Sequence, residues 1–300
     1  MSVASRLWAG HRLLAATLVV AGSGLLPPSI ARAQPRYSWS GWYVGGSIGH
    51  AWNDDGTVNP NATGSTTGLF AGEAPFIVAS QLATLGPLDT NPDGLLGGVQ
   101  TGYNLQFNAF VVGIEGDYSW ADINGSNSRT SHSEFNIPRE PGFGVTTTIN
   151  AREQVDSLAT LRARLGFTPV DQLLLYVTGG LAYGRVSSGI DVSMIETAVP
   201  PANNPCITFT PSSGSHSDSR TGWTAGGGGE WAFTQTVSAK FEYLHYDLGT
   251  LNYGANQSAS ISCPGSNPAN TPFAFANLAP SAQIKGDIVR VGLNVQLGEP

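Results

Sequence analysis

The chain has 300 residues, of which 38 are glycine and 12% are charged, about half the ~25% that soluble domains carry. Acidic residues outnumber Lys and Arg by 21 to 14, and the formal net charge is −7. This acidic balance argues against nucleic acid as a partner.

The first predicted element is an export signal. A basic start ending at Arg12 precedes a largely apolar, uncharged stretch over residues 13–30, and residues 31–33 (ARA) follow. The small-x-small pattern is typical of a signal-peptidase site. A membrane-spanning helix is the alternative, but glycines and the Pro27-Pro28 pair interrupt the run well short of the ~20 residues that such a helix needs. We therefore expect residues 1–33 to be a cleaved signal peptide.

Segments with alternating apolar and polar residues recur along the rest of the chain. The clearest is residues 289–297 (VRVGLNVQL), and the pattern returns at 110–120 (FVVGIEGDYSW) and 160–167 (TLRARLGF). Because successive side chains of a strand point to opposite faces, each segment has one apolar and one polar face. Each has about the 9–11 residues that a tilted strand needs to cross the hydrocarbon of a membrane.

Eight such strands are expected, at residues 41–52, 94–105, 109–120, 155–167, 172–186, 220–233, 236–248 and 284–297. The connections alternate between tight turns and polar segments of dozens of residues. A soluble β-sandwich would have no reason to collect all its long connections at one end. This alternation of short and long connections favours an all-β fold over residues 34–300. We expect an eight-stranded antiparallel transmembrane β-barrel in the outer membrane, with four long extracellular loops and short periplasmic turns.

Aromatic residues support a membrane barrel. Six of them lie near the predicted periplasmic ends of strands: Trp39, Trp42, Phe110, Phe167, Trp231 and Phe233. Aromatic girdles mark the interfaces of membrane barrels, so we expect all six at the periplasmic interface.

Short motifs in the strands resemble the small porin-like outer-membrane proteins of alphaproteobacteria. They are residues 39–46 (WSGWYVGG), 102–104 (GYN), 113–117 (GIEGD), 161–166 (LRARLG), 176–184 (YVTGGLAYG), 242–249 (EYLHYDLG) and 289–294 (VRVGLN). The resemblance implies the OmpA-like eight-stranded barrel, with outer-membrane lipids, lipopolysaccharide and the barrel-assembly machinery as partners. The chain departs from it after Leu297, where residues 298–300 (GEP) stand in place of the terminal aromatic residue that the machinery recognises.

Charged residues also fall on the polar faces of the predicted strands. They are Glu115, Asp117, Arg162, Arg164, Glu230, Lys240, Glu242 and Arg290. Neighbouring strands should bring the first two acids to the two arginines of the 160–167 segment, and a tight hairpin should bring Glu230 to Lys240.

These inward charges have two readings. They could line an ion-selective pore, or they could form a plug of satisfied salt bridges. The interior of an eight-stranded barrel is just wide enough for side chains to fill, and buried charges are costly unless they are paired. We favour the plug, with small or intermittent conductance.

Several motifs suggest chemistry that their context does not support. Residues 45–49 (GGSIG) match the nucleophile elbow of hydrolases, but that motif needs a strained turn from a strand to a helix, whereas Ser47 lies inside an alternating strand. The five histidines lack the spacing of metal ligands. The sequence predicts no catalytic residue, no metal site and no cofactor, and hence no enzyme.

The long loops hold two further features. Cys206 and Cys263 lie in two different loops expected outside the cell, where such a pair more often forms a disulfide than stays free. In the first loop, apolar residues follow Pro75 with helical spacing: Phe76, Ile77, Val78, Leu82 and Leu85. They form either a short helix on the barrel rim, which we favour, or an exposed patch for a ligand or a host surface.

The sequence therefore predicts a structural outer-membrane barrel protein with at most minor porin-like permeability. The alternative is a surface receptor or adhesin whose long acidic loops bind a ligand. A barrel lipid hydrolase is a distant third hypothesis.

Overall fold

The computed structural model describes residues 37–53, 56–67, 85–137, 140–198, 207–261 and 273–297. These residues belong to one compact unit, Tyr37–Pro300. Its strands are β1 Gly41–Trp52, β2 Thr57–Asn59, β3 Ala62–Thr67, β4 Leu88–Asp89, β5 Asp93–Phe107, β6 Phe110–Ile137, β7 Glu140–Val170, β8 Leu173–Ala198, β9 Ile207–Thr210, β10 Ser212–Ala232, β11 Val237–Asn252, β12 Ala255–Ile261, β13 Phe273–Leu278 and β14 Ser281–Leu297. Among the described residues, no helix is long and apolar enough to cross a membrane.

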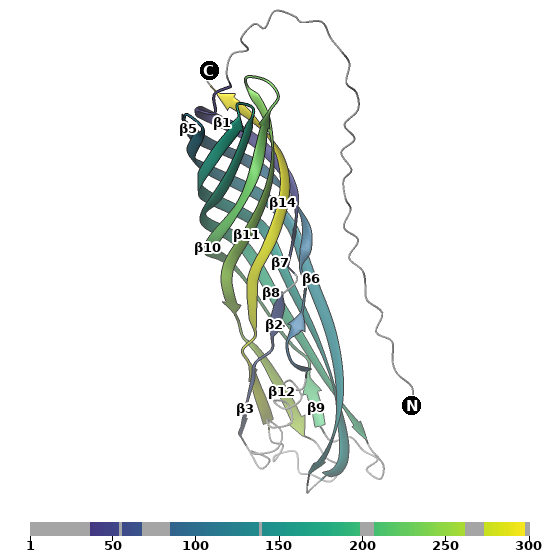
Figure 1. Cartoon of the computed structure of the whole chain (residues 1–300). Helices are drawn as coiled ribbons and strands as arrows, with labels where there is room; N and C mark the ends of the chain where they lie inside the picture. Colours follow the sequence, from purple (N-terminus) through teal and green to yellow (C-terminus); the bar gives the residue numbers. More distant parts are fainter. Residues whose placement is uncertain are drawn as a thin grey trace, which may run out of the picture. The chain divides into compact units, whose positions relative to one another are not determined.

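Eight long strands close into a barrel (Figure 1). They pair in the order β1-β5-β6-β7-β8-β10-β11-β14, and β1 returns antiparallel to β14 from Trp42↔Leu297 to Trp52↔Asp287. Closure pairs the backbone groups of each crossing strand on both sides, as hydrocarbon requires. The tight turn between β5 and β6 uses Asn108 at φ 56°, a left-handed conformation that asparagine tolerates well. The predicted eight-stranded antiparallel barrel is confirmed.

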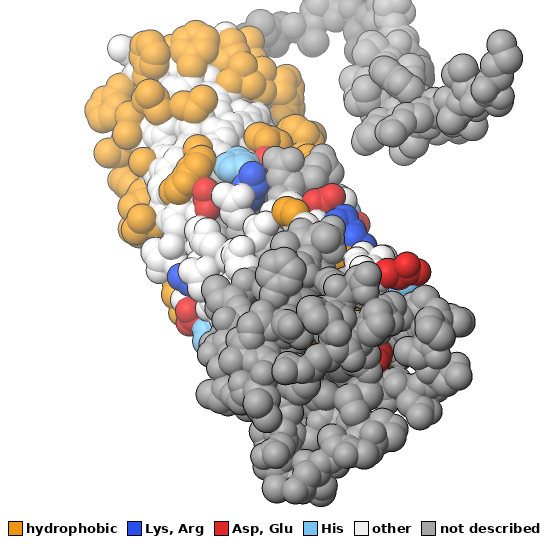
Figure 2. Space-filling model, turned by 90° about the horizontal axis from the view of Figure 1, so that it is seen from below, with side chains coloured by type: hydrophobic (Ala, Val, Ile, Leu, Met, Phe, Trp, Pro, Cys, Tyr) orange, Lys and Arg blue, Asp and Glu red, His pale blue; other side chains and the backbone are white. Residues whose placement is uncertain are grey.

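An apolar belt surrounds the part of the barrel next to the tight turns. On β6, the outward residues Phe110, Ile114 and Trp120 are at least half exposed on the bare protein, whereas the inward Glu115 is fully buried. In Figure 2 the hydrophobic side chains gather over one end of the barrel, and acidic and basic side chains lie beyond that band. Alternation along each strand therefore presents apolar side chains to lipid and polar ones to the lumen.

The strands continue well beyond the apolar belt, which the sequence did not lead us to expect. The segment between residues 121 and 154 was expected as a loop, yet β6 and β7 form a ladder that reaches Ile137↔Glu140. The alternation persists there in weaker form, because Ile149, Ala151 and Val155 face inward between polar residues. Residues from other connections form a second, small sheet in the order β3-β13-β12-β9.

Apolar side chains fill the extended part of the barrel. A single buried cluster includes Ile123, Val155, Ile190 and Leu251. Where β1 and β5 end, β2 and β4 continue the wall, since β2 pairs with β14 at Ala282↔Val58 and with β4. The first connection thus contributes to the wall and the core of the extension.

Candidate functional site

The eight inward charges project into the lumen from five strands. Direct backbone partners across the ladders include Glu115↔Arg162 and Glu242↔Arg290. Apart from Asp117, at 8%, each of the eight residues is at most 4% exposed, taken either over the whole residue or over its side chain. Their position follows from alternation, because each lies between outward apolar residues.

Arg162 lies at the centre of the charge network, the name used here for these eight residues. Its guanidinium donates to Glu115, to Asp117 at 2.9 Å and to Glu242 at 3.0 Å. Its Nε donates to the Thr160 hydroxyl at 2.8 Å. One arginine therefore neutralises carboxylates from two strands, β6 and β11, and its fork of donors suits this geometry.

Arg290 and Lys240 complete this layer of the network. Arg290 Nε donates to Glu242 at 2.7 Å and its Nη1 donates to Asp117 at 3.1 Å. Lys240 Nζ lies 2.9 Å from Glu115 and 3.8 Å from Glu242. Each carboxylate of the layer thus meets at least two cations, which compensates the cost of burying it.

Arg164 lies between this layer and a second one, which is formed by Tyr43, Tyr176 and Glu230. Its Nη1 donates to the Tyr43 hydroxyl at 2.7 Å, and its Nη2 lies 3.1 Å from Glu230. The guanidinium also lies 3.8 Å from the centre of the Tyr176 ring, where a cation–π attraction operates.

The expected pairing of Glu230 with Lys240 is wrong. The two residues are backbone partners across β10 and β11, but Glu230 binds Arg164 and accepts a hydrogen bond from Asn294 at 2.7 Å. Lys240 turns instead to Glu115 and its strand neighbour Glu242. Lys240 therefore lies where the carboxylates of Glu115 and Glu242 are both within ion-pair distance.

The periplasmic end of the lumen is covered by the segment that precedes β1. Tyr37 and Trp39 are buried there, and the indole Nε1 of Trp39 donates to the backbone oxygen of Asp171 at 3.0 Å. The prediction that Trp39 belongs to the outer aromatic girdle is therefore wrong, because this residue precedes the first strand and turns inward. A void of about 10 Å³ remains beside it, roughly the space of one water molecule.

The other five girdle residues face outward. Trp42, Phe110, Phe167, Trp231 and Phe233 are each at least 45% exposed on the bare protein. Tyr43 and Tyr176, which were not singled out in the sequence, belong to the lumen. The same alternation that placed the charges inward would have found both tyrosines, whereas it carries no information about Trp39.

The remaining predicted site residues are placed as follows. Ser47 lies in the middle of β1, faces the lumen and is 7% exposed. Cys206, Cys263 and the loop residues Phe76, Ile77, Val78 and Leu82 lie outside the described residues. Leu85, the last residue of that apolar series, is buried in the core of the extension.

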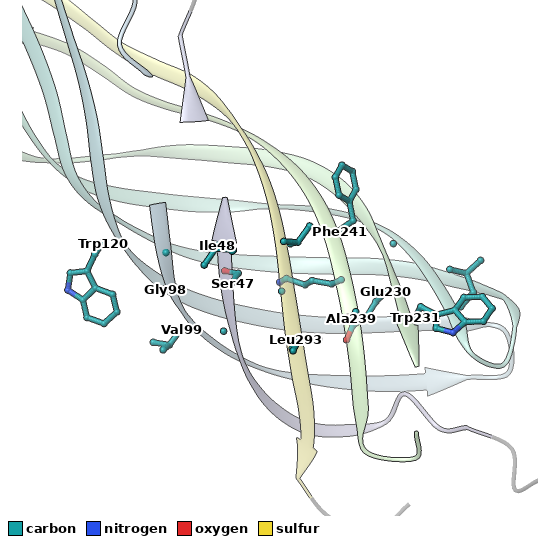
Figure 3. Close-up of a pocket in the computed structure, with 17 residues that line it drawn as sticks. Ser47, Ile48, Gly98, Val99, Trp120, Glu230, Trp231, Ala239, Phe241 and Leu293 are labelled. Atoms are coloured by element: carbon teal, nitrogen blue, oxygen red, sulfur yellow. The ribbon is translucent and has the colours of Figure 1, made fainter. Parts of the chain in front are cut away.

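A hollow of about 1130 Å³ lies on the outer wall of the barrel. Its lining includes Gly46 and other small residues, and Trp120, Ile48, Ala239 and Phe241 are labelled in Figure 3. Trp120, Ile48 and Phe241 are exposed residues of the apolar belt, whereas the lining also includes Ser47, Glu230 and Lys240, whose side chains face the lumen.

Four acids and four bases make the charge network neutral, and its groups bind one another and neighbouring polar side chains such as Thr160 and Asn294. The network lies between the cluster that contains Tyr37, Trp39 and Tyr176 and the apolar core of the extension, so that three layers occupy the described lumen. This arrangement is suited to sealing the barrel, because a passing ion would have to separate buried pairs.

Comparison with known proteins gives the following similarities. The model of the outer membrane protein beta-barrel domain matches residues 17–263. A 31 kDa outer-membrane immunogenic protein of Brucella melitensis is 32% identical and covers 75% of this chain and 78% of its own length. A 25 kDa outer-membrane immunogenic protein of Brucella abortus is 26% identical over 75% of this chain and 73% of its own length. The solved structure of neisserial surface protein A covers 86% of this chain and 98% of its own, with 12% identity and a TM-score of 0.31.

Proposed function

This chain belongs to the outer membrane protein beta-barrel domain family, and from that premise we propose that it is a structural outer-membrane barrel with at most minor permeability. In this proposal the signal peptide directs export, the assembly machinery inserts the barrel, and lipids and lipopolysaccharide surround the apolar belt.

The charge network is the observation that supports a closed lumen. The side chains of Arg162, Glu115 and Lys240 have no exposed surface. Breaking a buried pair costs about 3–5 kcal/mol, and each ~1.4 kcal/mol is a factor of ten. A state with one such pair broken would then be populated about 10²–10⁴-fold less than the closed one, so that conduction is rare and brief.

Liposome swelling tests this proposal. Liposomes containing the purified protein are diluted into isotonic arabinose, and the swelling rate is compared with that of protein-free liposomes and of liposomes with a general porin. The proposal expects swelling close to the protein-free rate. Swelling comparable to the porin at equal protein content would contradict it.

A receptor or adhesin is the second candidate, and the extension beyond the belt favours it. The β6–β7 ladder continues from Asn124↔Gln154 to Ile137↔Glu140, a length that membrane crossing does not require. A rigid sheet outside the membrane can position a binding surface more accurately than loose loops.

Adherence of displaying cells distinguishes the two candidates. Cells producing the full protein are compared with cells producing a variant in which a short turn joins Asn124 to Gln154. A receptor role expects lower adherence to cultured animal cells for the shortened variant at equal surface level. Equal adherence for both would remove the support that the β6–β7 extension provides.

A further inference from the structure

Glu153 is a carboxylate that the charge network does not use. It lies in β7 beyond the apolar belt, because its strand neighbours Arg152 and Gln154 are polar and exposed where belt residues would be apolar. Glu153 itself is 2% exposed. Ala151 and Val155, on the same face of the strand, both belong to the apolar core of the extension.

Among the described residues, Glu153 has no cation within ion-pair distance. The neighbouring Arg152 faces outward and pairs with Asp191 at 2.9 Å. The titratable groups that face Glu153 from the other elements are the phenols of Tyr246, in β11, and Tyr253, which follows β11. Neither phenol offers a positive charge to an ionised carboxylate.

Thr90 is the hydrogen-bond partner of Glu153 and belongs to the first connection. Its hydroxyl lies 3.0 Å from the Glu153 carboxylate and 3.3 Å from the backbone oxygen of Gly56. A hydroxyl has one hydrogen to donate. A protonated Glu153 can donate to Thr90, which then donates to Gly56. An ionised Glu153 accepts the hydrogen bond from Thr90, which then has no hydrogen to donate to Gly56.

The contacts around Thr90 hold the first connection in the barrel wall. The Thr90 amide donates to the Gly56 oxygen at 2.8 Å, and the Asn53 amide donates to the Pro92 oxygen at 2.9 Å. These bonds join the two ends of the connection, next to β2 and β4, where they continue the wall. The pairing of β2 with β14 and the bond from Asn127 Nδ2 to the Asp89 oxygen at 2.8 Å hold the same segment, and the chain through Thr90 is the one that includes Glu153.

We propose that protonated Glu153 is a pH-sensitive latch that keeps residues 56–60 and 85–92 closed in the wall of the extracellular extension. Ionisation leaves a buried, uncompensated carboxylate and breaks the chain through Thr90. Residues 56–60 and 85–92 then separate from the wall so that water hydrates the charge, while the ladders of the membrane barrel stay formed.

The direction of the pH dependence follows from burial. Burial raises the pKa of Glu153 to about 7, whereas a hydrated glutamate titrates near ~4.3. Between these values the closed state holds a proton that the open state releases. The ratio of closed to open molecules is therefore largest in acid, falls as the pH rises to about 7 and is constant above that pH. The total fall in this ratio is roughly 10²-fold or more.

Amide hydrogen exchange of the full-length protein in detergent micelles tests the latch. Protection factors, corrected for the intrinsic exchange rate at each pH, are measured for the amides of Thr90 and Asn53 from pH 4.5 to 8. We expect a fall of about 100-fold for both, whereas the amide of Arg162 in the membrane barrel stays constant.

Three variants sharpen the result. Glu153→Gln stays neutral and should show acid-like protection at every pH, whereas Glu134→Gln, the same change at an exposed position of β6, should retain the wild-type fall. Thr90→Val removes both side-chain bonds of the chain, so it should lower the protection in acid, and because the carboxylate loses its donor it should also move the transition to higher pH. The latch is wrong if the wild type shows equal protection at pH 5 and 8, or if Glu153→Gln retains the fall. Should Glu153→Gln fail to fold, the pH dependence of protection in the wild type and in Thr90→Val still tests the latch.

Discussion

Replacing Arg162 by alanine should destabilise the barrel far more than replacing an exposed arginine of the same strand. Arg162 contacts Glu115, Asp117 and Glu242 together, as does Arg290 from β14. The loss of Arg162 leaves four buried acids facing three bases.

The expected magnitude follows from the burial of these groups. The side chains of Arg162 and Glu115 have no exposed surface, so water cannot replace the lost contacts without opening the barrel. Removing one partner from a buried pair costs about 3–5 kcal/mol. The other cations, Arg290 and Lys240, remain in contact with these acids, and we therefore expect the lower half of that range.

Urea unfolding in lipid vesicles or detergent measures the effect. Arg152→Ala is the matched control, because this arginine of β7 is 60% exposed and forms one surface pair with Asp191, an interaction of about 0–1 kcal/mol. Arg162→Met combined with Glu115→Gln restores neutrality and should be more stable than Arg162→Met alone, since the two sites are coupled.

An unchanged midpoint for Arg162→Ala would refute this reasoning. It would mean that the arginine lines water and that solvent replaces its bonds at little cost. Equal losses for Arg162→Ala and Arg152→Ala would lead to the same conclusion.

Three further predictions concern the two ends of the barrel. Trp39→Ala should remove about 3–5 kcal/mol of stability, the usual cost of deleting a buried indole, and should accelerate solute entry from the periplasmic side in the swelling assay; unchanged stability would place Trp39 outside the packed lumen. Cys206 and Cys263 should form a disulfide that the barrel does not need, and thiol labelling of both in unreduced, unfolded protein would exclude it. In a background without these cysteines, a cysteine at Ser213 should react with an impermeant thiol reagent on intact cells and one at Asn108 should not, and labelling at Asn108 would invert the topology.

The membrane part of the fold could be predicted because alternation is a strong signal there. In the 289–297 segment every outward position is apolar, and the predicted strand agrees with β14. The extension was missed since most of its outward residues on β7, such as Thr148, Asn150 and Gln154, are polar residues that a loop also uses. In residues 145–155, only the inward valine, isoleucine and alanine retain the period of two.

The lumen residues could be predicted as a face, but not as a set of pairs. Alternation places Glu230 and Lys240 inward, whereas the choice of partner depends on side-chain reach across the barrel, which brings Arg164 to Glu230. Trp39 and Glu153 show two further limits. The first lies outside any strand, and the second lies in a segment whose strand character the sequence did not reveal.

Single-channel recording in planar bilayers tests the closed lumen most directly. With the purified protein inserted in 1 M KCl, the account predicts no steady conductance and only rare, brief, small openings. The charge network should keep the lumen shut at both polarities, because its pairs are buried and balanced. A stable open level in most insertions, with the folded protein verified in the same sample, would show that ions pass the network and would contradict the account.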